Sequence, residues 1–478
     1  MCCFSELVRI TDTSVSDFRF WREPCKSPLK DRLRIFLLVV TLLLPLVSLQ
    51  AATEPPSVDP AKIWTLPELV DLARQNNPDY RIAAWEQGLS RYLRLQAAGN
   101  FLPSLSSSAS FSQSNSRRIS WIGFEGEPVD IPEAITSISR SSRYSLSGSL
   151  SLFNGGRNLL EWMAADHNIT ATGLQLTSTD QWLVYQVTSA SYQTMAAAEQ
   201  LTGTRSFLEE QQDKFERTLE LYRLGVNTHL DTLQSWIDLL NQRNALLEDE
   251  NSLAMQQATL NELLGLPVDA KLQFAPPAQM INPELLQQEE LLAQALELNP
   301  NLQLLRNDIE LKRIRQWQAT AAYLPTLDAE FSLSASADLG GDDRFFSTPE
   351  NRNRYVGLRL SLPLFQGFNT TYALQASRLE HFRSRESYDK ALREKETELQ
   401  QILLELHKLY QQHDTNSQQL LLSRLTKEKT WELYRLQQVT LLEYRSAENQ
   451  FLQSRFNELI SRYYFLIQLA LLEQAVGE

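Results

Sequence analysis

The side chains that could carry chemistry in this sequence are few and widely separated. The five histidines are His167, His229, His381, His407 and His413. No two of them lie four residues apart on one helix, which is the spacing of a helical metal site. Gly155 and Gly156 follow a strand-like segment, but the other glycines of a phosphate-binding loop are missing. We therefore expect neither an enzyme nor a cofactor or metal site.

Two acidic residues stand out for a different reason, because they occupy matching places in two copies of one pattern. Asp231 and Glu443 are each preceded nine residues earlier by a tyrosine, Tyr222 and Tyr434. Each acid lies just after a predicted helix turn. Acidic groups repeated around a pore would favour cations. The plainer alternative is that both are solvated charges on a helix surface.

The segment Tyr144–Arg157, YSLSGSLSLFNGGR, changes from strand to helix within one line of sequence. Apolar residues alternate with serines up to Leu152, which is the two-residue period of a strand. Asn154 and two glycines then predict a turn, and a long proline-free helical stretch follows. The segment Val356–Asn369, VGLRLSLPLFQGFN, makes the same change.

These two segments belong to a duplication of nearly the whole chain. Asn77-Pro78 matches Asn299-Pro300 at an offset of 222, whereas Phe153 and everything after it matches the second copy at an offset of 212. More than a hundred residues after Phe153 contain no net gap. Two long helices held in register would impose this constraint, since one inserted residue turns a helix by about 100°. The ten extra residues of the first copy then fall between its two strands. We predict surface loops there, at 115–143 in the first copy and at 338–354 in the second.

We predict a segment 1–52 with an extended leader and signal peptide, a first repeat at 53–286 and a second at 287–478. Each repeat contains a helix, a β-hairpin (104–153 or 326–365), a very long helix, a tip turn (224–228 or 436–440) and a last helix. The long helix from about 154 to 224 would be roughly 100 Å long at about 1.5 Å per residue. The helices at 78–99 and 229–264 should pack end to end beside it in a coiled-coil bundle.

The four predicted strands are about ten residues long, with one apolar and one hydrophilic face, which suits outer-membrane barrel strands. A small soluble sandwich is the alternative. Four strands cannot close a barrel, and an open sheet edge is unstable in lipid. A membrane barrel must therefore be shared: two chains would give eight strands and a plugged barrel, and three would give twelve and an aqueous lumen.

An N-terminal export signal is predicted from basic residues followed by the apolar run Ile35–Leu49 and two alanines. A membrane anchor is the alternative. The cysteines Cys2, Cys3 and Cys25 all precede the predicted cleavage region, so the exported chain would have no disulfide. The net charge of −13, without a basic stripe, argues against a nucleic-acid partner.

The order of these motifs resembles the TolC-like outer-membrane efflux protein family over about 63–477. The residues that carry the resemblance are the paired Asn-Pro, the paired Leu-Pro-[Ser/Thr]-Leu, the two strand-to-helix changes and the matching segments after Tyr222 and Tyr434. The resemblance implies a membrane α+β fold: a homotrimer whose twelve-stranded β-barrel continues as a periplasmic α-helical barrel. It further implies a periplasmic adaptor protein and an inner-membrane transporter as partners, with outer-membrane lipid around the barrel.

In that family the tip turns close the duct and meet the adaptor. The corresponding residues here are Leu224, Gly225, Val226, Asn227, Thr228, Leu436, Gln437, Gln438, Val439 and Thr440. The resemblance marks Tyr222, Asp231, Tyr434 and Glu443 as lumen gate candidates. The sequence departs from the family pattern at Gln437, Val439 and Ser446, where a glycine, a basic residue and a second acid can occur.

The sequence thus predicts a passive exit duct in the outer membrane of a Gram-negative bacterium, extending into the periplasm. It would belong to a tripartite efflux or type I secretion system, and the inner-membrane partner would supply the energy. An exported coiled-coil scaffold or adhesin without a channel is the alternative. The cargo is not encoded in any of these motifs.

Overall fold

The computed structural model describes residues 62–119, 134–338, 351–436 and 438–477, all within one compact unit, Pro55–Glu478. The predicted signal segment 1–52 lies outside these residues. Within the described residues, none of the helices is both long and apolar enough to cross a membrane.

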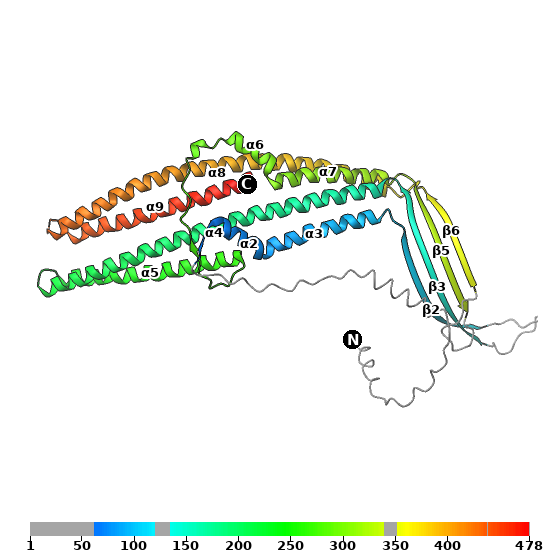
Figure 1. Cartoon of the computed structure of the whole chain (residues 1–478), viewed down its shortest axis with the longest axis horizontal. Helices are drawn as coiled ribbons and strands as arrows, with labels where there is room; N and C mark the ends of the chain where they lie inside the picture. Colours follow the sequence, from blue (N-terminus) through cyan, green and yellow to red (C-terminus); the bar gives the residue numbers. More distant parts are fainter. Residues whose placement is uncertain (1–61, 120–133, 339–350, 437, 478) are drawn as a thin grey trace, which may run out of the picture. The chain divides into compact units, whose positions relative to one another are not determined.

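The helices and strands follow the duplicated order of the sequence (Figure 1). The first repeat contains β1 (Ile63–Trp64), α2 (Leu66–Asn76), α3 (Pro78–Gly99), β2 (Ser104–Ile119), β3 (Ala134–Asn154), α4 (Arg157–Arg223) and α5 (His229–Leu264). A connecting segment contains β4 (Gln273–Phe274) and the short 3-10 helix η1 (Pro283–Leu285). The second repeat contains α6 (Gln288–Leu298), α7 (Pro300–Ala321), β5 (Thr326–Asp338), β6 (Asn351–Ser361), α8 (Asn369–Arg435) and α9 (Leu441–Val476).

Corresponding helices of the two repeats have equal lengths. α4 and α8 each have 67 residues, α5 and α9 each have 36, and α3 and α7 each have 22. α4 starts three residues later than the sequence suggested, because Asn154 ends β3 and Gly155 and Gly156, both at positive φ, form the turn. The predicted ranges 78–99 and 229–264 are the observed bounds of α3 and α5.

The first predicted helix of each repeat is in fact two helices. Asn77 has extended backbone angles (φ −63°, ψ 126°), and Pro78 occupies the first position of α3, where its missing N–H costs nothing. The Asn77 side chain accepts hydrogen bonds from the N–H groups of Asp79 and Tyr80, at 2.9 and 3.3 Å, and so starts the second helix. Asn299 does the same for α7.

The short helices pack along the long ones, as the sequence predicted. α3 and α5 both contact α4, and α7 and α9 both contact α8 (Figure 1). The side-chain amide of Asn77 donates to the Leu263 carbonyl at 3.0 Å, which joins the start of α3 to the end of α5. The repeats also contact each other, because α4 packs against α7 and α9. Buried apolar clusters stabilise these junctions, around Leu183 and Leu260 in the first repeat and around Leu399 and Phe465 in the second.

The strands form one antiparallel sheet in the order β2-β3-β5-β6 (Figure 1). We call one surface of this sheet the apolar face; it carries Leu105, Ala109, Phe111, Leu146, Leu150, Phe331, Leu333, Val356, Leu358 and Leu360. The opposite surface, the serine face, carries Ser104, Ser106, Ser108, Ser145, Ser147, Ser149, Asp328, Glu330, Ser332, Tyr355 and Arg359. Serine hydroxyls pair across β2 and β3 at 2.7–2.9 Å.

Three details of the predicted hairpins are wrong. β2 and β3 extend into 115–119 and 134–143, which we expected to be loop, and β6 begins at Asn351. These stretches are rich in serine, asparagine and arginine, which is a composition typical of a loop. The last strand ends at Ser361 instead of continuing to 365, because Pro363 has no N–H to donate to a neighbouring strand. The loop residues 120–133 and 339–350 lie outside the described part of the chain.

Candidate functional site at the helix tips

The first tip turn closes with backbone hydrogen bonds and one glycine. α4 ends at Arg223, and Gly225 takes a left-handed conformation (φ 76°) that favours glycine. The N–H of Val226 donates to the Leu221 carbonyl at 2.9 Å, which turns the chain back toward α5. Leu224 and Val226 are exposed at this tip.

The second tip turn has the same closing bond. The N–H of Gln438 donates to the Leu433 carbonyl at 2.9 Å, which is the counterpart of the Val226 bond. Gln437, which replaces the expected glycine, lies outside the described residues. Leu436 is exposed, and Val439 is half-buried.

Asp231 and Glu443 both cap the helix that follows their tip. The Thr228 N–H and hydroxyl donate to the Asp231 carboxylate at 3.0 and 2.7 Å, and the Asp231 N–H donates back to the Thr228 hydroxyl at 3.2 Å. Thr440 and Glu443 form the same reciprocal pair at 2.7, 3.0 and 3.3 Å. Such capping boxes satisfy N–H groups that a helix start leaves free. The two acids therefore have a structural role that the sequence analysis did not assign.

Capping also fixes the charge of Glu443. The Thr440 N–H, and then the Thr440 hydroxyl, lower the pKa of the Glu443 carboxyl below its ordinary value. Glu443 is exposed, so the negative charge faces water at the start of α9. A carboxylate held in this way stays ionised to a lower pH than a free one.

Two of the four predicted gate residues, Asp231 and Tyr434, line one hollow between the tips. The hollow has a volume of about 510 Å³, and Lys214, Arg217 and Arg435 also line it. Burial, and then the negative charge of Asp231, raise the pKa of the Tyr434 hydroxyl. The structure thus brings an acid of the first repeat close to a tyrosine of the second.

The other two predicted gate residues lie elsewhere. The Tyr222 ring packs against His229, with 5.6 Å between the ring centroids, across the first tip turn. Glu443 does not line the hollow that contains Asp231 and Tyr434. Asp231 and Glu443 therefore share the same capping box, but only Asp231 lies beside the hollow.

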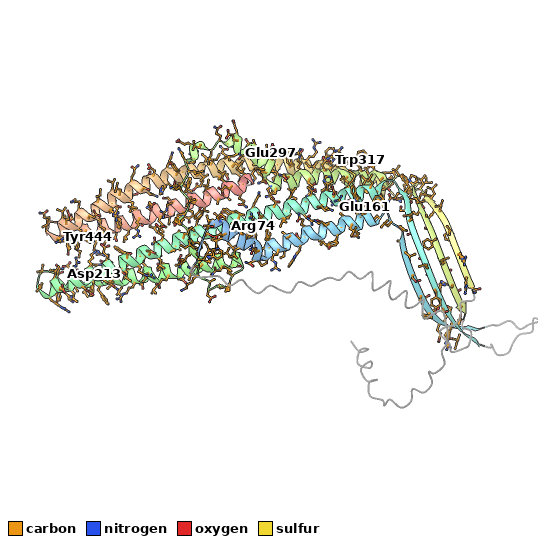
Figure 2. All side chains as sticks on the ribbon, in the orientation of Figure 1. Arg74, Glu161, Asp213, Glu297, Trp317 and Tyr444 are labelled. Carbon is orange, nitrogen blue, oxygen red and sulfur yellow. The ribbon has the colours of Figure 1, made fainter. Side chains whose placement is uncertain are left out.

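A buried ion pair next to the hollow was missed by the sequence analysis. The Lys214 ammonium on α4 donates to the Glu448 carboxylate on α9 at 2.7 Å, and the two side chains are only 10% and 5% exposed. The Tyr444 hydroxyl donates to the same carboxylate at 3.1 Å. Figure 2 shows Tyr444 on α9 and Asp213 on α4 near the tip end of their helix pairs.

Aromatic rings enclose this ion pair. The Lys214 ammonium lies 4.5 Å from the centre of the Tyr444 ring, and the Trp431 and Tyr434 rings pack against Tyr444 at 5.0 and 6.0 Å. Burial, followed by the charge of Glu448, raises the pKa of the Tyr444 hydroxyl far above its ordinary value. We call Lys214, Tyr444 and Glu448 the tip clamp, because they join the repeats close to both tips.

Further ion pairs lie along the boundary between the repeats. Lys427 on α8 pairs with Glu210 on α4 at 2.7 Å, and Arg445 on α9 pairs with Asp238 on α5 at 2.6 Å. Among the described residues, no three His, Cys, Asp or Glu side chains are grouped as a metal site would require. The chemistry of this region is thus that of charge pairs and packed rings.

The arrangement of these parts defines a class of protein. A sheet with one apolar and one hydroxyl face, joined to long helices that return at two capped tips, is typical of outer-membrane channel proteins. The chain belongs to the outer membrane efflux protein family, whose sequence model matches residues 69–266 and 291–478. The resemblance to TolC-like proteins is thereby confirmed.

Individual relatives agree with this assignment. The alkaline protease secretion protein AprF of Pseudomonas aeruginosa is 24% identical over 353 residues, which are 72% of this chain and 69% of AprF. The CmeC outer-membrane channel of Campylobacter jejuni has a TM-score of 0.71 at 16% identity, covering 90% of this chain and 94% of CmeC. The outer-membrane protein VceC of Vibrio cholerae has a TM-score of 0.69 at 17% identity, covering 86% and 96%. At these identities the structural matches show a common fold.

The family assignment gives the location and the role of the chain. It is an outer-membrane exit duct that extends into the periplasm, as the sequence predicted. The family consists of channel proteins, and it does not favour the scaffold or adhesin alternative.

Proposed function

We propose that three copies of this chain form one duct, with a twelve-stranded barrel and a continuous helical barrel below it. The observation that carries this proposal is a mismatch between equivalent positions of the two repeats. Tyr192 on α4 and Leu459 on α9 meet where the repeats touch, and each is 4% exposed. Their counterparts 212 residues away, Leu404 on α8 and Leu247 on α5, are each 62% exposed.

A second copy can cover these exposed residues by repeating the contact that already exists inside the protomer. Within the chain α4 packs against α9. The equivalent contact places α8 of one chain against α5 of the next. Such a head-to-tail contact is not self-complementary, so it generates a ring when the rotation from one copy to the next closes.

The sheet supports the same arrangement. β2 and β6 are its two edge strands. In lipid, each unpaired N–H or C=O group of an edge strand costs roughly several kcal/mol, because no water can hydrogen-bond to it. Pairing β6 with β2 of the next copy removes both edges.

Three copies fit better than two. The serine face carries Asp328 as well as the ion pair Glu330–Arg359 (2.9 Å). A barrel of about eight strands has an interior filled by packed side chains, where such charges would be desolvated. Twelve strands would leave a water-filled lumen around them.

The repeats also predict the register of the joint between copies. Both hairpins pair in the same register, since Ser104–Ser149 corresponds to Thr326–Ser361. The Leu146–Leu333 pair that joins the hairpins therefore corresponds to Leu358 opposite Phe111 of the next chain.

Cysteine cross-linking tests this register. A variant carrying Leu358→Cys and Phe111→Cys should form covalent dimers and trimers on oxidation in outer membranes, because the two positions face each other only between chains. Replacing Ser110 instead of Phe111 turns the second thiol to the opposite face and should abolish most of the product. Equal cross-linking of both variants, or none in the first, would contradict the proposed joint.

We further propose that the tips are the periplasmic entrance of the duct and the docking site for an adaptor protein, which links it to an inner-membrane transporter. The docking residues would be Leu224, Gly225, Val226, Asn227, Thr228, Leu436, Gln437, Gln438, Val439 and Thr440. Tyr222, Asp231, Tyr434 and Glu443 would gate the lumen. The exposed Leu224, Val226 and Leu436 at the tips and the negative charge beside them support this role.

Conductance measurements separate the charge of Glu443 from its capping role. Glu443→Gln removes the charge but can keep the capping box, since glutamine also bonds the Ncap N–H. We expect it to reduce cation selectivity several-fold, measured as the reversal potential of single channels in a salt gradient. Thr440→Ala removes the hydroxyl of the capping box and leaves both the backbone N–H and the carboxylate, so selectivity near neutral pH should be kept.

The pH dependence of the same channels provides the control. Because the pKa of Glu443 is lowered, its charge is present at neutral pH and is lost only as the pH falls through that lowered value. Thr440→Ala keeps the backbone N–H, which lowers this pKa most, and loses only the hydroxyl, so the selectivity should disappear at a somewhat higher pH. If Glu443→Gln left selectivity intact, the carboxylate would be a helix cap and nothing more.

A further inference from the structure

Two arginines lie on the apolar face of the sheet, where the other side chains of β6 are apolar. Arg352 and Arg354 share a side of β6 with Val356, Leu358 and Leu360, because side chains alternate along a strand. Both are exposed, and within the described part of the chain neither forms an ion pair. Arg359, on the serine face of the same strand, pairs with Glu330.

The depth of these arginines follows from strand geometry. The exposed rings of Phe365, Phe368 and Tyr372 follow the end of β6, where an aromatic girdle at the periplasmic boundary would lie. Arg352 lies nine residues before Ser361, the last residue of β6. At roughly 3.3 Å per residue and a tilt of about 40°, this separation spans about 23 Å, close to the height of about 25 Å of the apolar band of such barrels. Arg352 thus lies close to the outer boundary of the membrane, and Arg354 lies slightly below it.

A shallow hollow of about 330 Å³ lies beside them on the apolar face. The register places Arg354 opposite Leu333, and Arg352 opposite Ala335, which is itself paired with Tyr144. Leu146, Leu333 and Ala335 give the hollow an apolar part of its lining, and Arg352, Arg354 and Tyr144, which also line it, carry hydrogen-bond donors.

The chemistry of this hollow fits one kind of ligand. Guanidinium groups bind phosphate through two parallel N–H bonds, which an ammonium cannot do. The apolar part of the lining suits an acyl chain. We propose that Arg352, Arg354 and Tyr144 bind a phosphorylated lipid of the outer leaflet, with its phosphate on the arginines and a chain on the apolar face. This inference rests on the proposed barrel, which sets the depth of β6.

Lipid binding by the purified protein tests the proposal. The probe is lipid A that carries its phosphates, compared with the same lipid after dephosphorylation and with inorganic phosphate alone, by native mass spectrometry of the detergent-solubilised trimer. Phosphorylated lipid A should bind the unaltered protein, and Arg352→Gln with Arg354→Gln should weaken binding at least tenfold. Arg359→Gln, on the other face of the same strand, is the matched control and should bind normally.

Each remaining outcome has one meaning. Equal binding of dephosphorylated lipid, or unchanged affinity in the double variant, would overturn the arginine site. Competition by inorganic phosphate at similar concentration would assign the site to a free anion and likewise overturn the lipid proposal. Conductance of the double variant should equal that of the unaltered protein. A failure of the unaltered protein to form channels would instead overturn the barrel.

Discussion

Glu448→Ala is expected to loosen the boundary between the repeats by about 3–5 kcal/mol, because it leaves the Lys214 ammonium buried without a partner. The side chains are almost fully enclosed, so little water can replace the lost carboxylate. Hydrogen exchange of the α9 amides near the tip should accelerate by about two to four orders of magnitude, at roughly 1.4 kcal/mol per tenfold change.

Two control variants make this result specific to the buried pair. Glu432 on α8 pairs with Lys429 at 2.9 Å, but both side chains are mostly exposed, so Glu432→Ala should cost about 1 kcal/mol or less. Replacing both Lys214 and Glu448 by methionine and leucine should recover most of the lost stability, since no charge then remains buried. A loss in Glu448→Ala no larger than that in Glu432→Ala would show that the tip clamp does not hold the repeats together.

Asn299→Ala should be the second most damaging of the changes considered, at about 2–4 kcal/mol. Its side-chain oxygen accepts from the N–H groups of Asn301 and Leu302 at 3.0 and 3.2 Å, which caps α7, and its amide donates to the Ala475 carbonyl at 3.0 Å. Loss of a cap costs about 1 kcal/mol, and an unsatisfied buried polar group about 1–3 kcal/mol. Urea unfolding of the solubilised protein would measure the change.

The chain itself provides the comparison for Asn299. Asn77 makes the equivalent bonds in the first repeat, so Asn77→Ala should cost a similar amount. Asn282 caps only the short helix η1, through one bond to the Glu284 N–H at 3.0 Å, and Asn282→Ala should cost about 1 kcal/mol or less. A loss of stability in Asn299→Ala no larger than that in Asn282→Ala would contradict this prediction.

Much of the helical part could be predicted because its boundaries depend on local residues. Asn77-Pro78 starts α3, and Gly225 and Gly265 end α4 and α5 in left-handed conformations. Because the second repeat follows the first at a constant offset of 212 from Phe153 onward, the same offset also predicted the boundaries of α8 and α9. Strand limits depend on pairing with distant segments, so the serine-rich ends of β2 and β3 could not be separated from loop.

The tip clamp could not be predicted, because its partners are far apart and the duplication gives no hint of them. Lys214 and Glu448 are separated by 234 positions, and their counterparts in the other repeat are Thr426 and Trp236. Conversely, the sequence marked Asp231 and Glu443 as equivalent. Only the surrounding side chains show that one lies beside Tyr434 and the other does not.

The equal helix lengths limit how this protein can change during evolution. A residue inserted into α4 alone would move the first tip by about 1.5 Å and turn every later side chain by about 100° away from α5 and α9. Tolerated length changes should therefore come as matched insertions in α4 and α5, repeated in α8 and α9, and in multiples of about seven residues that restore the packing face. By contrast, the two repeats already differ by ten residues between the strands of their hairpins.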